Sequence, residues 1–139
     1  MMKKKVLKFM LLVIALAMFL AITGCNGPAS PGEATAENSI GEGGTSFSIK
    51  VTDNEDVTTL WTVHTDEETV GDALYVAGLV EGDHTDFGLM ILSVDGVVAD
   101  FAANGAWWGF FIDGELAMVG VSDTIIEPGE EYALVYMVD

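Results

Sequence analysis

The chain has 139 residues, of which half are hydrophobic, and its 5 basic and 22 acidic residues give a formal net charge of −17. A length of this order corresponds to one domain, and the hydrophobic content excludes a chain that is disordered throughout. Four of the five lysines stand between positions 3 and 8, every acidic residue lies at Glu33 or later, and arginine is absent. This balance excludes nucleic-acid binding, because Lys and Arg are the residues that neutralise phosphates.

The first 25 residues have the pattern of an export signal followed by an anchor. Lysines precede an apolar run from Phe9 to Ile22, which is shorter than the ~20 residues of a membrane-spanning helix but suits a signal peptide. Ile22-Thr23-Gly24-Cys25 resembles the bacterial lipobox, which implies diacylglycerol on the Cys25 thiol and cleavage just before it. The alternative is an ordinary secretory signal with an incidental cysteine. We predict a lipoprotein signal peptide over residues 1–24 and lipidation at Cys25.

The predicted anchor places the protein in the cell envelope, at the outer face of the cytoplasmic membrane or, in a diderm host, at the outer membrane. After removal of residues 1–24, Lys50 alone faces 22 acidic residues, which is a formal charge of −21. Such a body has no polybasic patch to adhere to anionic lipid, so the lipid on Cys25 is the expected membrane contact. Because Cys25 is the only cysteine, no internal disulfide is expected.

Residues 25–44 are predicted to form a flexible acidic linker. They are rich in Gly, Pro, Ser, Ala and Glu, and Ile40 is their only large apolar residue. So little apolar surface cannot offset the entropy cost of ordering the chain. The folded domain is therefore predicted to span residues 45–139.

The first half of this domain contains signals for two strands and one helix. Alternation over 47–51 and a β-branched and aromatic run over 58–65 predict a hairpin. A helix is predicted over 69–78, where Thr69 can cap the start, with Asp72 three residues later, and Gly78 can end it. Residues 81–88 are predicted to form a loop.

The second half is predicted to be mostly strand. Strands are expected at 89–94, 107–112 and 132–138, with Asp-Gly hairpin turns after the first two. A strand or arm at 97–101, a loop at 102–105, a returning strand at 116–119 and a turn at 128–130 complete the prediction. The fold class that follows is α+β, with one short helix on one face of a mixed, mainly antiparallel sheet.

Several motifs in this order resemble the transcobalamin-like C-terminal domain of bacterial surface proteins. They are Thr69-Val70-Gly71-Asp72-Ala73-Leu74, Asp95-Gly96, the aromatic block from Asn104 to Gly114 (NGAWWGFFIDG), Gly120-Val121 and Pro128-Gly129-Glu130. The resemblance covers residues 69–138 and implies a β-grasp-like fold, related to soluble ligand-binding β-grasp domains. In animal transcobalamin and intrinsic factor this domain closes over cobalamin bound to a larger helical domain. No such helical domain is expected in this chain, so a partner protein domain would complete the site.

The resemblance makes four residues candidates for ligand binding: Trp107, Trp108, Phe110 and Gly120. Trp107 and Trp108 are neighbours on a predicted strand, so their side chains point to opposite faces. We expect one to pack under the helix and the other to face the open side of the sheet or a loop pocket. The exposed ring would suit a corrin, another macrocycle, a sugar or a protein partner, unless loops cover it.

No metal site or catalytic site is predicted. His64 and His84 are the only histidines, and both are interpreted as ordinary surface or half-buried residues, because a metal needs several convergent ligands. Asp53, Glu55 and Asp56 do not have the spacing of an EF-hand calcium loop. No nucleophile stands in a recognisable motif with a histidine.

The sequence thus predicts a membrane-anchored, extracellular, noncatalytic ligand-binding module. Cobalamin or another corrinoid is the first specific ligand to consider, and no cofactor is required. The alternative is a protein-interaction or structural module of a cell-surface assembly.

Overall fold

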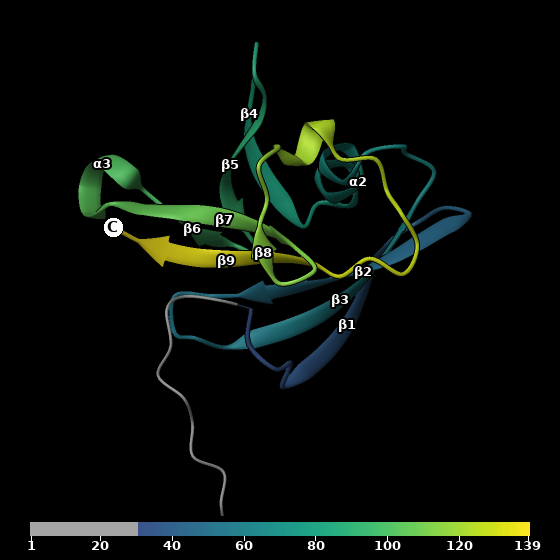
Figure 1. Ribbon diagram of the computed structural model, residues 1–139, viewed down its shortest axis with the longest axis horizontal. Helices are drawn as coiled ribbons and strands as arrows, with labels where there is room; N and C mark the ends of the chain where they lie inside the picture. Colours follow the sequence, from purple (N-terminus) through teal and green to yellow (C-terminus); the bar gives the residue numbers. More distant parts are fainter. Residues whose placement is uncertain (1–30) are drawn as a thin grey trace, which may run out of the picture.

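The computed structural model describes residues 31–139, which form two β-sheets, two short α-helices and one 3₁₀ helix (Figure 1). The predicted signal peptide, Cys25 and the first part of the predicted linker lie outside the described residues. The elements in chain order are β1 Ala36–Gly41, β2 Thr45–Thr52, β3 Thr58–Thr65, α2 Val70–Ala77, β4 Val80–Thr85, β5 Gly88–Val94, β6 Val97–Val98, α3 Phe101–Asn104, β7 Ala106–Ile112, β8 Glu115–Leu116, η1 Val121–Asp123 and β9 Tyr132–Val138.

The larger sheet has six strands in the order β1-β3-β2-β9-β7-β8. Strands β2 and β3 form the predicted antiparallel hairpin, and β9 pairs antiparallel with β7 but parallel with β2. The smaller sheet is the antiparallel series β4-β5-β6. The described residues are therefore mainly β with a little helix, rather than α+β. The predicted mixed sheet and single substantial helix are present, but the second sheet was not predicted.

Helix α2 forms where the capping residues predict it. The Thr69 hydroxyl accepts a hydrogen bond from the Asp72 amide (3.2 Å), and Gly78 ends the helix with φ of 80°, the left-handed conformation that glycine adopts freely. The buried helix residues are Val70, Gly71, Ala73 and Leu74. This face packs on the larger sheet and fixes the helix there.

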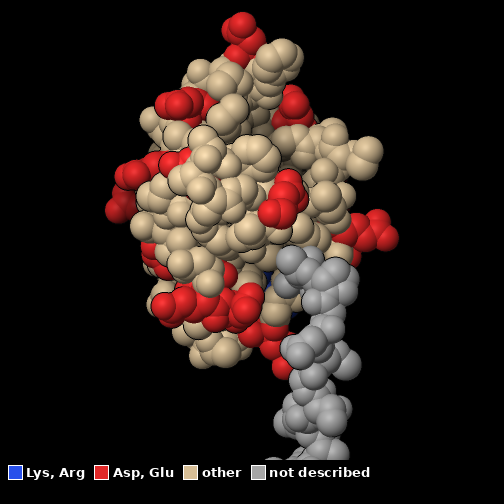
Figure 2. Space-filling model, turned by 90° about the vertical axis from the view of Figure 1, so that its left-hand side faces the viewer, with Lys and Arg blue, Asp and Glu red and all other residues tan. Residues whose placement is uncertain are grey.

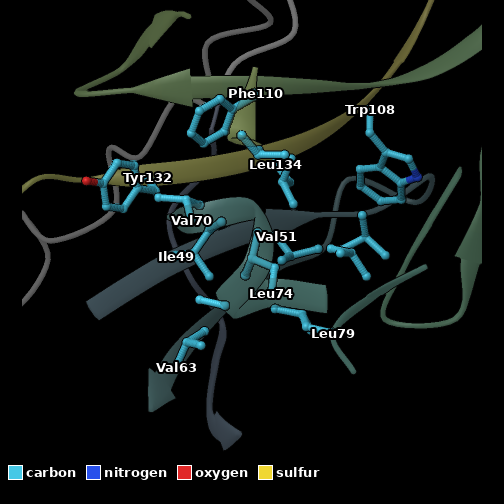
Figure 3. Close-up of a cluster of buried hydrophobic side chains, with 14 of the residues drawn as sticks. Ile49, Val51, Val63, Val70, Leu74, Leu79, Trp108, Phe110, Tyr132 and Leu134 are labelled. Atoms are coloured by element: carbon cyan, nitrogen blue, oxygen red, sulfur yellow. The ribbon is translucent and has the colours of Figure 1, made fainter. Parts of the chain in front are cut away.

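The main core lies between α2 and one face of the larger sheet, and Figure 3 shows its side chains pointing toward one another. Alternate residues of each strand enter it, as the period of two requires. Ile49 of β2, Val63 of β3 and Leu134 of β9 are fully buried there. Tyr132 packs between Phe47, edge to face at 5.6 Å, and Phe110, stacked at 6.1 Å.

The opposite face of the larger sheet carries no α-helix of the described residues. A small buried cluster of Phe111, Ala133 and Val135, with Met137 packed against it, covers its β7–β9 part. Toward β2 this face becomes polar, and Lys50 stands directly opposite Ala133 in the register.

Four local predictions are corrected by the structure. The returning strand expected at 116–119 is limited to β8 Glu115–Leu116, and residues 117–119 belong to the loop before η1. Residues 36–41, predicted within the flexible linker, form β1, which pairs parallel with β3. Residues 81–88, predicted as a loop, contain β4 and its turn into β5. The loop expected at 102–105 begins inside the short helix α3. Few side chains of β1 and β4 are buried. These strands are instead held by backbone pairing with a neighbouring strand, and such pairing requires no apolar periodicity in the sequence.

Candidate functional site

Strand β7 separates the two candidate tryptophans onto opposite faces of the larger sheet. Trp108 is 7% exposed in the main core, where its ring meets the Tyr136 ring edge to face at 5.5 Å. Trp107 is half-buried and lies opposite Met137 on the other face. The prediction that the two side chains face opposite sides of the sheet is confirmed, and Trp108 is the one that enters the core.

The four candidate ligand-binding residues do not form one cluster. Phe110 is 8% exposed and belongs to the same core as Trp108, so these two rings support the scaffold. Gly120 is exposed and precedes η1, eight residues after the end of β7. Ligand contact by Trp107, Trp108, Phe110 or Gly120 stays a prediction, with Trp107 and Gly120 the more accessible pair.

The two most exposed large apolar side chains of the described residues stand in the β4–β5 turn and the β8–η1 loop, although Val76, Ile125 and Val98 elsewhere are also 66–68% exposed. Phe87 is 96% exposed, Met118 98%, Val119 51% and Leu116 49%. We name these four residues and Gly120 the apolar rim. Single exposed apolar residues need no explanation, but several on neighbouring loops mark a surface that meets a ligand or another protein.

The β4–β5 turn is held in one conformation by Thr85. Its hydroxyl donates to the Gly88 carbonyl (2.9 Å) and accepts from the Phe87 amide (3.1 Å). Gly88 has φ of 103°, a conformation that side chains strongly disfavour. These bonds fix the backbone while the Phe87 ring projects into solvent.

The β8–η1 loop is fastened at both ends. The Ala117 amide donates to the Phe110 carbonyl (2.8 Å), and Thr124 Oγ1 donates to the Gly120 carbonyl (2.9 Å). Val121, directly after Gly120, is 3% exposed and anchors the loop in the core. Met118 and Val119 are therefore presented between two fixed points.

The turn and the loop meet at Ser122. Its hydroxyl accepts a hydrogen bond from the Leu89 amide (2.9 Å), which joins η1 to the start of β5. A Cβ at Gly88 would lie 3.0 Å from the Ser122 Cβ, so a glycine is needed for this close approach. The β4–β5 turn is thus joined to η1, the helix that directly follows the β8–η1 loop.

The surroundings of the apolar rim are acidic. Asp86 adjoins Phe87, Asp83 lies opposite Met90 in the hairpin, and Asp123 ends η1; all three are exposed. Residues 51–139 contain no Lys or Arg. Acidic side chains are spread over the face shown in Figure 2.

Lys50 lines a separate hollow of about 290 Å³ on the other face of the larger sheet, together with Pro31, Gly114, Glu131, Tyr132 and Ala133. A second hollow, of about 350 Å³, lies between the β1–β2 turn and the end of α2, with Glu42 and Val76 in its wall. Neither hollow contains a residue of the apolar rim or one of the four candidates.

His64 is half-buried and His84 is exposed, as expected. His64 Nε2 is 3.1 Å from Ser39 Oγ, and the His84 ring meets the Tyr75 ring edge to face at 4.7 Å. Within residues 31–139, no three His, Cys, Asp or Glu side chains converge as metal ligands. No helix of the same residues is long and apolar enough to cross a membrane.

Phe87 and Met118 were not identified from the sequence. Phe87 is a lone apolar residue in a polar stretch, and Met118 lies in an apolar run that was predicted to be a strand, so neither was expected to be exposed on a loop. The available signal was an apolar side chain beside turn-forming residues, as in Thr85-Asp86-Phe87-Gly88.

A family model described as "Domain of unknown function (DUF4430)" matches residues 67–134, from just before α2 into β9. No curated protein matches the chain. A solved structure from Ruminococcus gnavus ATCC 29149, described as a "putative metal binding protein", is similar with a TM-score of 0.64 and 23% identity, over 69% of this chain and 99% of that chain.

Haptocorrin, solved in complex with Cbi, is also similar, with a TM-score of 0.51 and 15% identity. The match covers 68% of this chain and 25% of haptocorrin, so the chain corresponds to about a quarter of that protein. At these identities the likeness shows a shared fold alone. The expected transcobalamin-like fold is supported to that extent.

Proposed function

We propose that this protein is a lipid-anchored, noncatalytic binding module of the cell envelope that holds a small ligand against its apolar rim. The rigid presentation of Phe87, Met118 and Val119 on two hydrogen-bonded loops is the observation that carries the proposal. Burial of these side chains against a ligand with an apolar face would contribute favourable free energy to binding.

Cobalamin or another corrinoid is the ligand we propose first. Two things support it: the fold shared with haptocorrin, which was solved with Cbi, and the sequence resemblance described above. We assign the fold as β-grasp-like, because the β2–β3 hairpin is followed by α2 on one face of a mixed sheet. The apolar rim would contact only one face of the ligand, so a partner protein domain would cover the other face.

Titration of the chain from Asn26 onward, which contains every described element, tests the proposal. Equilibrium dialysis against cyanocobalamin and against aquacyanocobinamide, a corrinoid without the nucleotide, measures binding directly. Phe87→Ala and Met118→Ser should each weaken binding severalfold, since each removes apolar contact area. Phe101→Ala is the matched control, because Phe101 is also exposed (62%) but lies on α3. Absence of binding up to high micromolar corrinoid would exclude this ligand class for the isolated chain.

The anchor is tested separately. Cys25→Ser should abolish acylation and release the protein from the membrane fraction. Unchanged processing and membrane association of the variant would contradict the lipidation at Cys25.

A protein-interaction role is the second candidate, and the free edge of β1 favours it. This strand ends the larger sheet, so its outer backbone groups are open to an added strand. Ser39→Pro would block such pairing. A specific envelope partner that binds the wild-type chain and not this variant would support the interaction role.

A further inference from the structure

We infer that strand β1 pairs with an extended segment of another protein, and that a basic side chain of this segment enters the hollow at the end of β1. The inference rests on the interaction role proposed for the β1 edge and names the partner's chemistry. Three observations carry it: an unprotected strand edge, a hollow with a negative wall, and the charge of the edge itself.

Among the described residues, β1 is the long edge of the larger sheet, since the other edge, β8, has two residues and β1 has six. Natural sheets protect such edges with proline, lysine, a bulge or a covering element. Strand β1 (AENSIG) contains no proline or lysine, and its pairing with β3 has no register shift. It lies at the lower border of the sheet in Figure 1, and residues 36–39 are exposed. Its outer backbone groups are therefore open to an added strand.

The hollow of about 350 Å³ lies where β1 ends. Its wall is formed by Gly41, Glu42, His64, Thr65, Val76 and Ala77. Gly41 has φ of 82°, and a Cβ there would lie 3.2 Å from the Ala77 Cβ, so glycine allows the end of β1 to approach the end of α2. The volume is near the lower end of the roughly 300–1,000 Å³ of ligand pockets. It suits one side chain better than a larger ligand.

The wall of this hollow is negative. Helix α2 ends here with no basic residue in its last turn, so its last carbonyls carry the partial negative charge of a helix C-terminus. No hydrogen bond among the described residues ends on the Val76 or Ala77 carbonyl oxygen. Glu42 adds an exposed carboxylate. These groups favour a cationic head group, and the Val76 side chain can pack against its aliphatic stem.

The charge of the β1 edge selects the partner. Glu33, Glu37 and Glu42 are exposed along β1 and beyond its two ends. Lys50, the only lysine of residues 31–139, lies on β2, which β3 separates from β1. A second copy of the chain would bring like charges together at this edge, whereas a basic strand would be attracted along its whole length. The occupant is thus a basic segment of another protein.

Three end-blocked hexapeptides of alternating threonine and valine test the position of the basic side chain. One has arginine as its first residue, one has arginine as its last, and one has citrulline, which is neutral, as its first. Each is titrated into the nitrogen-15-labelled chain from Asn26 onward at about pH 8, where histidine is neutral, and at about 0.15 M salt. Amide chemical shifts report both the affinity and the place of binding.

Antiparallel pairing, the slightly more stable arrangement, puts the first residue of the peptide beside Gly41. We therefore expect the peptide with arginine first to bind about fivefold more tightly than the other two, from one ion pair and the helix C-terminus. The shifts should fall on residues 36–42 and 76–77. Equal affinities of the two arginine peptides, as general attraction to an acidic protein would give, would overturn the inference.

A charge change in the wall tests the assignment from the side of the protein. Glu42→Gln should reduce the preference for arginine over citrulline about twofold, because it removes the charge and keeps the shape. Glu115→Gln, on β8 at the opposite edge of the larger sheet, changes the net charge equally and is the matched control. Equal reductions in the two variants would overturn the inference.

The citrulline peptide separates this inference from the interaction role on which it rests. If all three peptides shift the β1 amides with equal affinity, β1 accepts strands but the basic side chain has no place in the hollow, and the inference fails alone. If no peptide shifts these amides, the interaction role of β1 fails with it. Corrinoid binding at the apolar rim is measured independently by dialysis.

Discussion

At the scale of single residues, Tyr132 shows how one buried polar group constrains both fold and pH response. Its ring is 1% exposed, its hydroxyl donates to Glu130 Oε2 (2.9 Å), and it accepts from the Glu127 amide (3.0 Å). Burial raises the pKa of Tyr132 above its ordinary value of 10.0, and the neighbouring Glu130 adds to the rise. The phenol is therefore kept neutral beside two glutamates at the start of β9.

This shift predicts a loss of stability in alkali. The pKa of Tyr132 is higher in the folded state than in the unfolded state, so the neutral phenol makes its full contribution to the free energy of unfolding below pH 10. This contribution is lost as the pH rises from 10 through the folded-state pKa. Tyr132→Phe should lower the free energy of unfolding by about 1 kcal/mol at pH 7, from the lost hydrogen bonds, but should flatten its decline above pH 10. Urea unfolding at neutral pH and above pH 10 measures both effects. Tyr75→Phe, at an exposed position on α2, is the control; equal alkaline slopes for wild type and Tyr132→Phe would contradict the prediction.

At the scale of elements, the sequence predicts those strands whose own side chains build the core. The hairpin of β2 and β3 and the strands β7 and β9 carry alternating or continuous apolar residues, and α2 carries both of its caps. Strands β1 and β4 are polar and largely exposed. These two strands form because each pairs with another strand, either distant in sequence or across a turn. The hydrophobic periodicity of a single segment carries no information about such pairing.

The same limit applies to the candidate site. Adjacent positions on one strand predict that Trp107 and Trp108 face opposite ways, but not that Trp108 takes the core side. The meeting of Gly88 with Ser122 joins segments 34 positions apart, as does the Leu89–Ser122 hydrogen bond at a separation of 33. Contacts of this kind define the apolar rim and leave no local pattern.

Strand β1 should contribute measurably to stability, although its sequence resembles a linker. It pairs with β3 from Ala36↔Thr59 to Gly41↔His64, and Ile40 packs against the core. A chain that begins at Thr45 should lose about 2–4 kcal/mol of unfolding free energy relative to one that begins at Pro31, through lost pairing and a cavity beside Val63. Chemical denaturation of both chains measures the difference. Ile40→Ala in the longer chain should cause only part of this loss of unfolding free energy. Equal stability of the two chains would show that residues 36–41 behave as a linker and do not contribute to the fold.

At the scale of the whole molecule, the charge sets both solubility and self-repulsion. Residues 31–139 hold all 22 acidic residues and one lysine, so nearly every pairwise interaction between charges is repulsive in the folded state. Repulsion of this kind favours the expanded chain, and salt screens it. The fold therefore has to gain its stability from the apolar core and from backbone pairing.

Thermal stability should consequently rise with ionic strength. Raising NaCl from about 0.01 to about 0.15 M shortens the Debye length from about 30 to about 8 Å, which removes most long-range repulsion between surface carboxylates. We expect the midpoint of thermal unfolding at pH 7, followed by circular dichroism, to increase by several degrees. NaCl and KCl should act alike, because screening depends on ionic strength rather than on a specific cation site. A midpoint that falls with salt would show that attractive ion pairs involving Lys50 outweigh the repulsion among the carboxylates.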